Sequence, residues 1–221
     1  MAWTNTGYFS SYQEIKNSPI QLGVNNGIPS NIEIVPGDLK FLDFNHDGVI
    51  NQADAYRQGY GTVPELQYGL TLGGNWKSFD FNILFQGSAD ALFAKQWEIM
   101  WAFSNNDNVF SKQNYYWAPE IANAAQFTRF YGKSWVNNER YYSTYELGSG
   151  DYLRIKSVEL GYNLPPKLIH NVGMSSARIY LSSINPVTWS KEPYLDPDNR
   201  DTRGGLMPPT RAFNIGLNLN F

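Results

Sequence analysis

The stretch Arg211-Ala212-Phe213-Asn214-Ile215-Gly216-Leu217-Asn218-Leu219-Asn220-Phe221 alternates between apolar and polar side chains. Successive side chains of a strand point to opposite faces of a sheet. From Phe213 onward, one face therefore carries only Phe, Ile and Leu, and the other carries only Asn and Gly. The stretch predicts a strand. By itself it fits a soluble sandwich, with the apolar face inward, as well as a membrane barrel with that face toward lipid.

Composition favours the membrane barrel. Aromatic residues make up 16% and charged residues 17% of the 221 residues, whereas a soluble domain usually carries about 25% charged residues. A transmembrane barrel combines aromatic girdles at the two interfaces with small polar residues inside and apolar residues outside. No apolar run approaches the ~20 residues that a membrane helix needs. The expected fold class is therefore all-β, with antiparallel strands that cross a membrane.

Composition and motifs exclude several classes of function. The absence of cysteine excludes disulfides, Cys-based metal sites and a thiol nucleophile. The net charge of −3 without a basic cluster argues against nucleic-acid binding. His46 and His170 have no serine–carboxylate partner in the sequence, and no Gly-x-Ser-x-Gly elbow occurs. We therefore do not expect an enzyme and predict no catalytic residue.

A hairpin is predicted in the middle of the chain. Residues 68–73 alternate between apolar and small or polar side chains, and residues 79–86 do the same. The short segment 75–78 between them is the predicted turn. Each strand is close to the 9–11 residues that a tilted strand needs to cross a bilayer.

A second pair of strands is predicted at 151–163 and 176–183. In the first of them, Leu153 falls on the opposite parity from Val158. An extra residue in a strand restores a common face, so we expect a β-bulge near Lys156. Together with the last strand and the hairpin, this pair gives five strands, which cannot close a large barrel without further strands.

The connections between these strands have very unequal lengths. The short ones are 75–78 and 164–175, with a helical turn at 165–173, and the long ones are 88–150, with a short helix at 92–103, and 184–210. Transmembrane barrels have short periplasmic turns and long outer loops. We therefore expect an extracellular loop region at 1–67, barrel strands with outer loops at 68–221, and a periplasmic C-terminus.

Residues 43–54 match the ligand spacing of an EF-hand calcium loop. Oxygen donors at alternating positions can surround one cation, and a glycine at the sixth position, here Gly48, allows the sharp turn. The expected ligands are Asp43, Asn45, Asp47, the Val49 carbonyl, Asn51 and Asp54. The alternative is an Asx-rich turn, in which these side chains bond their own backbone. Calcium, if bound, would have a structural role.

Aromatic residues crowd the expected outer loop 88–150. The candidates for contact with a ligand or partner are Trp97, Trp101, Tyr115, Tyr116, Trp117 and Trp135. Their rings could stack on sugars or pack on peptides, or they could pack within the loop or against a partner protein, where Tyr and Trp are enriched. We favour packing. A second acidic cluster, 196–201, lacks metal-ligand spacing and is expected to be a solvated loop.

Several motifs, in their order and spacing, resemble the TonB-linked SusC/RagA-like family over most of the chain. They are 36–48 (PGDLKFLDFNHDG), 68–70 (YGL), 79–87 (FDFNILFQG), 116–120 (YWAPE), 150–156 (GDYLRIK), 160–165 (LGYNLP), 177–180 (ARIY) and the terminal Phe221. Trp117-Ala118-Pro119 departs from the usual Trp-Thr-Pro of the family. The resemblance implies the C-terminal part of a plugged barrel of about 22 strands in the Gram-negative outer membrane.

The resemblance also implies a function and partners. Such transporters import oligosaccharides or peptides, work with a SusD-like surface lipoprotein, and use TonB through an N-terminal part that these 221 residues do not include. The main rival is a secreted all-β module that is stabilised by calcium and binds carbohydrate. A truncated gene product is a third alternative. The last strand distinguishes the transporter from the secreted module, because a sandwich buries the apolar side chains of this strand and a barrel exposes them to lipid.

Overall fold

The computed structural model describes residues 1–21, 31, 33–103, 108–109, 111–130, 142–170, 173–192, 195–198, 203, 206–207 and 209–221. The chain forms two compact units. Unit 1 comprises 1–60, 93–148 and 201–206, and unit 2 comprises 61–92, 149–200 and 207–221. Within the described ranges, no helix is both long enough and apolar enough to span a membrane.

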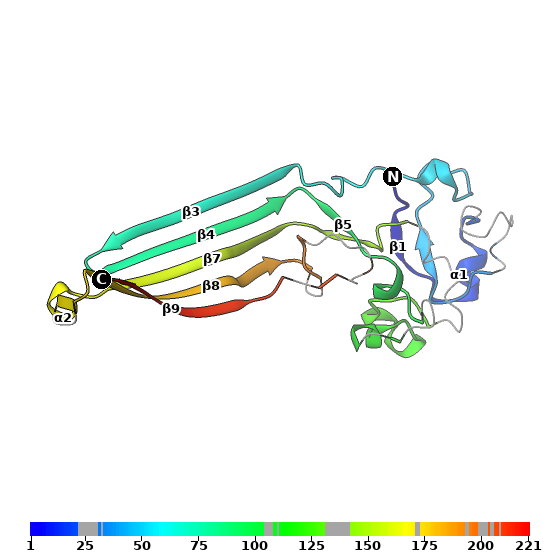
Figure 1. Ribbon diagram of the computed structural model, residues 1–221. Coiled ribbons are helices and arrows are strands. Elements are labelled where there is room, and N and C mark those ends of the chain that lie inside the picture. The colour runs from blue at the N-terminus through cyan, green and yellow to red at the C-terminus, as the bar shows by residue number, and fades with distance from the viewer. Residues whose placement is uncertain are drawn as a thin grey trace. The chain divides into compact units, whose positions relative to one another are not determined.

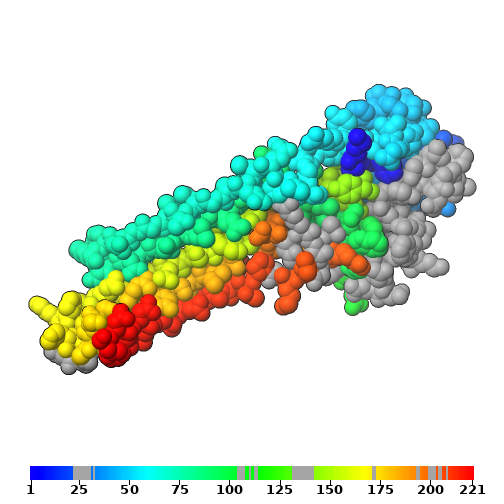
Figure 2. Space-filling view, turned by 45° about the horizontal axis from the view of Figure 1, so that its top comes forward, coloured from blue at the N-terminus to red at the C-terminus, as the bar shows by residue number. Residues whose placement is uncertain are grey.

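Unit 2 is a five-stranded sheet in which every neighbouring pair is antiparallel (Figure 1). Its strands, in spatial order, are β3 (Leu66–Trp76), β4 (Phe79–Ala89), β7 (Tyr152–Asn163), β8 (Ser176–Ser190) and β9 (Ala212–Asn220). The sheet is not closed. Figure 2 shows β3 (cyan) along one edge and β9 (red) along the other. The predicted all-β, antiparallel, unclosed fold is confirmed.

The register of the strands gives the sheet one apolar and one polar face. Residues paired across antiparallel strands share a face. One row of paired residues consists of Phe81, Leu160, Leu181 and Ile215. The adjacent row, on the opposite face, consists of Asn82, Glu159, Ser182 and Asn214. The alternation seen in single strands therefore continues across the sheet.

The apolar side chains of β9 are exposed. Phe213, Ile215, Leu217 and Leu219 are 75%, 75%, 63% and 44% exposed. No second sheet of the described residues covers them. This confirms the prediction for a barrel strand and contradicts the soluble sandwich, which would bury this face.

The predicted bulge near Lys156 is confirmed. Leu84 pairs with Ser157, but the next residue, Phe85, pairs with Ile155, so Lys156 is left without a partner on β4. The extra residue reverses the parity of β7 at this point. As a result, the apolar residues on both sides of the bulge lie on the same face of the sheet.

Two boundaries differ from the sequence prediction. β8 continues to Ser190, beyond the predicted end at 183. A second irregularity, at Asn185, interrupts the alternation of side chains without ending the strand, so the predicted strand stops too early. Residues 92–103 contain β5 (Leu92–Ala94) and a 3₁₀ helix at Trp97–Ile99 rather than one short helix. The predicted helical turn after β7 is present as α2 (Pro166–Ile169).

Unit 1 is built from short elements. They are β1 (Asn5–Tyr8), α1 (Tyr12–Lys16), β2 (Leu39–Phe41), β6 (Leu147–Ser149), which pairs with β5, and 3₁₀ helices at Gln52–Asp54, Ser111–Tyr115 and Pro119–Ala124. β1 and β2 pair antiparallel. Trp3, Leu39, Phe41 and Ile50 form a buried cluster beside this pair. Ile50 belongs to the calcium-like stretch, so one end of that loop is anchored in the core.

Candidate functional site

The calcium-like loop is held by side-chain to backbone hydrogen bonds. Asp43 accepts from the backbone N–H of Asp47 (3.2 Å) and of Gly48 (2.9 Å). Asn45 also accepts from the Asp47 N–H (3.0 Å), and Asp47 accepts from the Val49 N–H (2.8 Å). Acceptors that bond the backbone two residues on define Asx turns. The glycine at Gly48 has φ +85°, which allows the chain to reverse there.

Asp54 fastens the two ends of this loop together. Its side chain is 1% exposed. One carboxylate oxygen accepts from the N–H of Phe44 (2.9 Å), and the other accepts from the N–H of Asn51 (2.8 Å). The Asn51 carbonyl in turn accepts from the Trp3 indole N–H (2.8 Å), which ties the loop to the core. Asp54 therefore stabilises the loop through hydrogen bonds to both of its ends.

The six predicted calcium ligands thus lie in one loop, and their donor set consists of the hard oxygens that calcium prefers. Their arrangement corresponds to the Asx-rich turn that the sequence leaves open as the alternative. Over the described residues, no group of three or more His, Asp or Glu side chains comes together as a metal cluster. Calcium binding at this loop stays a prediction.

Two of the predicted contact residues are packed inside unit 1. Trp101 is 6% exposed and Trp117 is 8% exposed. The Trp117 ring lies against Gly37, where a Cβ would come within 2.6 Å of the ring. Trp97 packs against Trp101 with ring centroids 5.0 Å apart. These three rings therefore pack against residues of unit 1, and contact of any of them with a ligand or partner stays a prediction.

The remaining predicted aromatics differ in their surroundings. Tyr116 stacks on Phe130 with ring centroids 4.1 Å apart. Tyr115 is 54% exposed, so its ring is accessible to a ligand or partner. Trp135 lies outside the described residues.

A separate polar site lies on the polar face of the sheet in unit 2, around Arg154 of β7. The Arg154 side chain is 1% exposed. Its Nε donates to the Thr188 hydroxyl (2.9 Å), and its guanidinium forms an ion pair with Asp196. The carboxylate of Asp198 lies 3.6 Å away. Asp196 itself is only 13% exposed, so the prediction of a solvated acidic loop is wrong for this residue.

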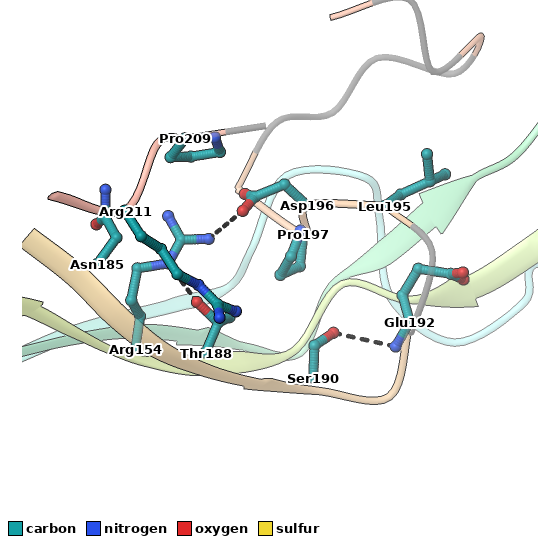
Figure 3. Close-up of a pocket in the computed structure, with 10 residues that line it drawn as sticks. All are labelled: Arg154, Asn185, Thr188, Ser190, Glu192, Leu195, Asp196, Pro197, Pro209 and Arg211. Atoms are coloured by element: carbon teal, nitrogen blue, oxygen red, sulfur yellow. Dashed lines mark hydrogen bonds and ion pairs between the residues drawn. The ribbon is translucent and has the colours of Figure 1, made fainter. Parts of the chain in front are cut away.

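These residues border a cavity of about 390 Å³ (Figure 3). The cavity is lined by Arg154, Asn185, Thr188, Ser190, Glu192, Leu195, Asp196, Pro197, Pro209 and Arg211. β7 and β8 supply its floor, and the segments around Pro197 and Pro209 lie above it (Figure 3). Two residues of the floor come from the part of β8 beyond the predicted strand end: Thr188 pairs with Arg154, and Ser190 pairs with Tyr152.

The irregularity in β8 places Asn185 at one side of this cavity. Ile155 pairs with Val187, whereas Ser157 pairs with Ile184, so Asn185 lies in a bulge. Its φ is +50°, a conformation that Asn tolerates better than most residues. Its Nδ2 donates to the Thr210 carbonyl (3.2 Å), which links the bulge to the start of β9.

Sequence reasoning missed this site. Arg154 belongs to the GDYLRIK motif, which assigns it no role, and Asn185 lies in the segment 184–210 that the sequence predicts to be a loop. One signal was the charge of Arg154 itself. A charged residue on a strand face that becomes buried needs a partner of opposite charge. Only the fold shows that Asp196, 42 positions away, supplies it.

An unclosed antiparallel sheet, apolar and exposed on one face and polar on the other, is typical of the wall of an outer-membrane β-barrel. The chain is 28% identical to TonB-dependent receptor P3 of Formosa agariphila over 84% of its own length. It is 27% identical to TonB-dependent receptor P26 of the same organism over 85% of its length. It spans only 19% and 20% of the length of these two relatives.

Solved structures share this fold. The RagAB peptide transporter superposes with a TM-score of 0.64 over 84% of this chain and 21% of that chain, at 19% identity. The RagAB peptide importer in its closed-closed state superposes with a TM-score of 0.64 over 99% of this chain and 23% of that chain, at 17% identity. No protein-family model matches the sequence. The resemblance to TonB-linked transporters of the SusC/RagA-like class is confirmed.

Proposed function

We propose that this chain is the C-terminal barrel segment of a TonB-dependent outer-membrane importer for oligosaccharides or peptides. In that setting the apolar face of the sheet contacts lipid and the polar face lines the barrel interior. The exposed strand edges of β3 and β9 pair with further strands, since an unpaired edge is not stable in a bilayer. The function is transport, without a catalytic step.

The apolar face carries this proposal. It extends over strands with side chains such as Leu70, Phe81, Leu160, Leu181 and Ile215, each more than 40% exposed. Water-soluble proteins rarely expose a continuous apolar surface of this kind. Lipid is a suitable neighbour for such a surface, and the relatives are named as TonB-dependent receptors.

The connections support a periplasmic C-terminus. The two-residue turn Lys77–Ser78 and the α2 connection lie at the same end of the sheet, since Asn163 donates to the Ser78 carbonyl (2.7 Å). The end of β9 is there as well, because Ser175 donates to the Asn220 carbonyl (2.8 Å). Short turns mark the periplasmic side of a transmembrane barrel. Unit 1 and the long connections would then lie outside the cell.

We infer two partners from the likeness to TonB-linked transporters. A SusD-like lipoprotein would contact the outer loops, where Tyr115 offers an exposed aromatic ring. TonB would act through a region outside these 221 residues. The cargo is a nutrient that binds within the polar interior. One solved neighbour is a peptide transporter, and we keep oligosaccharide or peptide cargo as the proposal.

Spin labels at two adjacent positions of β9, one on each face of the sheet, test the proposed membrane face. The chain has no cysteine, so one introduced cysteine carries one label. In the transporter assembled in lipid vesicles, a label at Leu217 should collide with oxygen, which dissolves in lipid. A label at Asn218 should collide with a water-soluble nickel complex. Equal accessibility to the two reagents at both positions would overturn the membrane assignment.

The rival, a secreted calcium-stabilised carbohydrate-binding module, is not supported. It requires the apolar residues of β9 beneath a second sheet, whereas they are exposed. Cell fractionation separates the two functions directly. We expect the protein in the outer-membrane fraction, and loss of its gene should abolish uptake of its cargo. Recovery of a soluble, secreted, sugar-binding protein would instead support the rival.

A further inference from the structure

We propose that segment 195–198, in the connection between β8 and β9, is a fixed constriction of the barrel interior, and that Arg154 is the positioning residue that holds it there. This inference rests on the proposed function, in which the polar face of the sheet lines that interior. It deepens the function, because cargo then passes between this segment and the opposite wall of the barrel.

The segment lies along the polar face of the sheet and does not simply continue outward from the strand end. β8 ends at Ser190. Asp196 and Pro197 nevertheless line a cavity together with Asn185 and Thr188, which both lie within β8 before that end (Figure 3). After β8, the chain therefore turns back over the sheet toward the middle of the strands.

A second cavity shows how far the segment reaches across the sheet. This cavity has a volume of about 460 Å³, and its lining includes Asp198 together with Gln67 of β3, Gln86 of β4 and Tyr152 of β7. Gln86 pairs with Arg154, so both belong to the polar face. The two cavities that the segment borders together involve β3, β4, β7 and β8. The segment therefore covers the wall across several strands.

Arg154 holds the segment against the wall by its charge. Its Nε donates to the Thr188 hydroxyl, which directs the guanidinium away from the sheet toward the segment. The guanidinium forms an ion pair with Asp196, and the carboxylate of Asp198 lies 3.6 Å away. The side chains of Arg154 and Asp196 are 1% and 13% exposed. Separation of a buried ion pair leaves an uncompensated charge, which is strongly unfavourable, so the segment stays in place.

The segment is also rigid in itself. The N–H of Asp198 donates to the side chain of Asp196 (3.0 Å), which forms an Asx turn. Pro197, between these two residues, is buried, and its ring fixes the backbone angle φ. A tight turn that a buried ion pair holds in place narrows the interior to one width. This is why we assign a fixed constriction rather than a lid that opens and closes.

Crosslinking in the assembled transporter tests the position of the segment. These 221 residues contain no cysteine, so cysteines can be introduced in pairs. A short bifunctional thiol reagent should join Asp198→Cys to Gln86→Cys, because the two positions border the same cavity. Asn82→Cys replaces Gln86→Cys in the control pair and should not be joined, because it lies roughly 13 Å farther along the same face of β4. Failure of the first pair to crosslink, or equal crosslinking of both pairs, overturns the proposal.

Thiol reagents of two sizes test whether the segment narrows the interior. A small charged methanethiosulfonate and a bulky polyethylene glycol maleimide are added outside intact cells, and Asn214→Cys on the polar face of β9 is the reporter. Asp196→Asn removes the charge that pairs with Arg154 and keeps the size of the side chain. Asp80→Asn is the matched control, because it weakens a different ion pair of the same face, with Arg178.

We expect Asp196→Asn to make the bulky reagent label the reporter severalfold faster and to leave the rate of the small reagent unchanged. Asp80→Asn should change neither rate. An unchanged rate of the bulky reagent in Asp196→Asn overturns the constriction. Labelling by the small reagent would still show that the polar face lines an interior open to the outside, so the proposed function stands or fails separately. The crosslinking test needs no variant of Asp196, and it decides the position of the segment even where Asp196→Asn does not assemble.

Discussion

The guanidinium of Arg178 on β8 crosses the backbone of Gly161 on β7 and reaches the carboxylate of Asp80 on β4, two strands away. Its Nε donates to Asp80 (3.0 Å), and its Nη2 also pairs with Glu159 (2.7 Å). The crossing depends on the missing side chain at Gly161, where a Cβ would collide with the guanidinium. One cation thus links three adjacent strands on the polar face of the sheet.

This relationship makes Gly161 sensitive to a single methyl group. Gly161→Ala should displace Arg178, break its pair with Asp80 and destabilise the barrel by about 1–3 kcal/mol, as overpacking does. Gly69→Ala is the control, because a Cβ there meets only the Phe85 carbonyl oxygen at an ordinary 3.5 Å. Denaturant unfolding of the assembled transporter measures both changes. Equal stability of the two variants would contradict the crossing.

A charge on the apolar face should be far more costly than a charge on the polar face. Ile215→Arg places a cation in the lipid contact region and should destabilise the folded barrel by about 2–4 kcal/mol near the bilayer midplane. Asn214→Arg, one residue earlier, points to the polar face and should cost much less. Folding titrations in lipid vesicles compare them. Similar penalties at both positions would argue against lipid on the apolar face.

Unit 1 contains an acid that should stay ionised at low pH. The hydrogen bond from Lys40 (2.6 Å), together with bonds from Ser10, lowers the pKa of Glu14 to about 2. A lowered pKa in the folded state means that the ionised pair stabilises the fold above the ordinary pKa, which is near 4.5. This stabilisation should disappear as the pH falls from 4.5 toward 2.

Nuclear magnetic resonance of a labelled Glu14 carboxyl group measures this pKa. Lys40→Met should return the value toward the ordinary range, because it removes the largest cause of the shift. Lys16→Met is the control, since it removes a nearby lysine that is not the ion-pair partner of Glu14. An unshifted Glu14 in the unmodified protein would rule out a persistent pair with Lys40.

The calcium-like loop gives a prediction with a clear control. Calcium titration of the assembled transporter should release or absorb heat, and Asp47→Ala should remove most of it, because the residue supplies one of the expected ligand oxygens. His46→Asn changes a non-ligand position, and Asn tolerates the φ of +60° found there. It should leave the heat unchanged. Identical heats in all three proteins would mean that this loop binds no calcium.

A variant of Asp54 tests whether the loop is held by its own hydrogen bonds or by a bound cation. Its carboxylate bonds the N–H groups of Phe44 and Asn51 without a metal. Asp54→Ala removes the acceptor of both N–H groups and should loosen segment 43–54 with or without calcium, at a cost of about 0.5–1.5 kcal/mol for each lost hydrogen bond. Hydrogen exchange of the segment, with calcium and with a chelator, measures the effect.

Much of unit 2 could be predicted because strand structure is encoded locally. A period of two residues assigns each side chain to a face, so Phe213 and Ile215 were expected to be exposed on one side and Asn214 on the other. The bulge at Lys156 also followed from a parity change within one strand. The end of β8 could not be predicted. The bulge at Asn185 breaks the alternation of apolar and polar side chains, and without that alternation the last part of the strand cannot be told from a loop.

By itself, the sequence determined the two faces of the sheet, its antiparallel strands and the likeness to TonB-linked transporters. Only the tertiary structure showed that Asp196 pairs with Arg154 and that Asn185 bonds Thr210, partners 42 and 25 positions apart. Alternation depends on neighbours one and two residues away, so it is visible in the chain. Contacts between a strand and a distant loop depend on register and on the path of the loop, which no local pattern specifies.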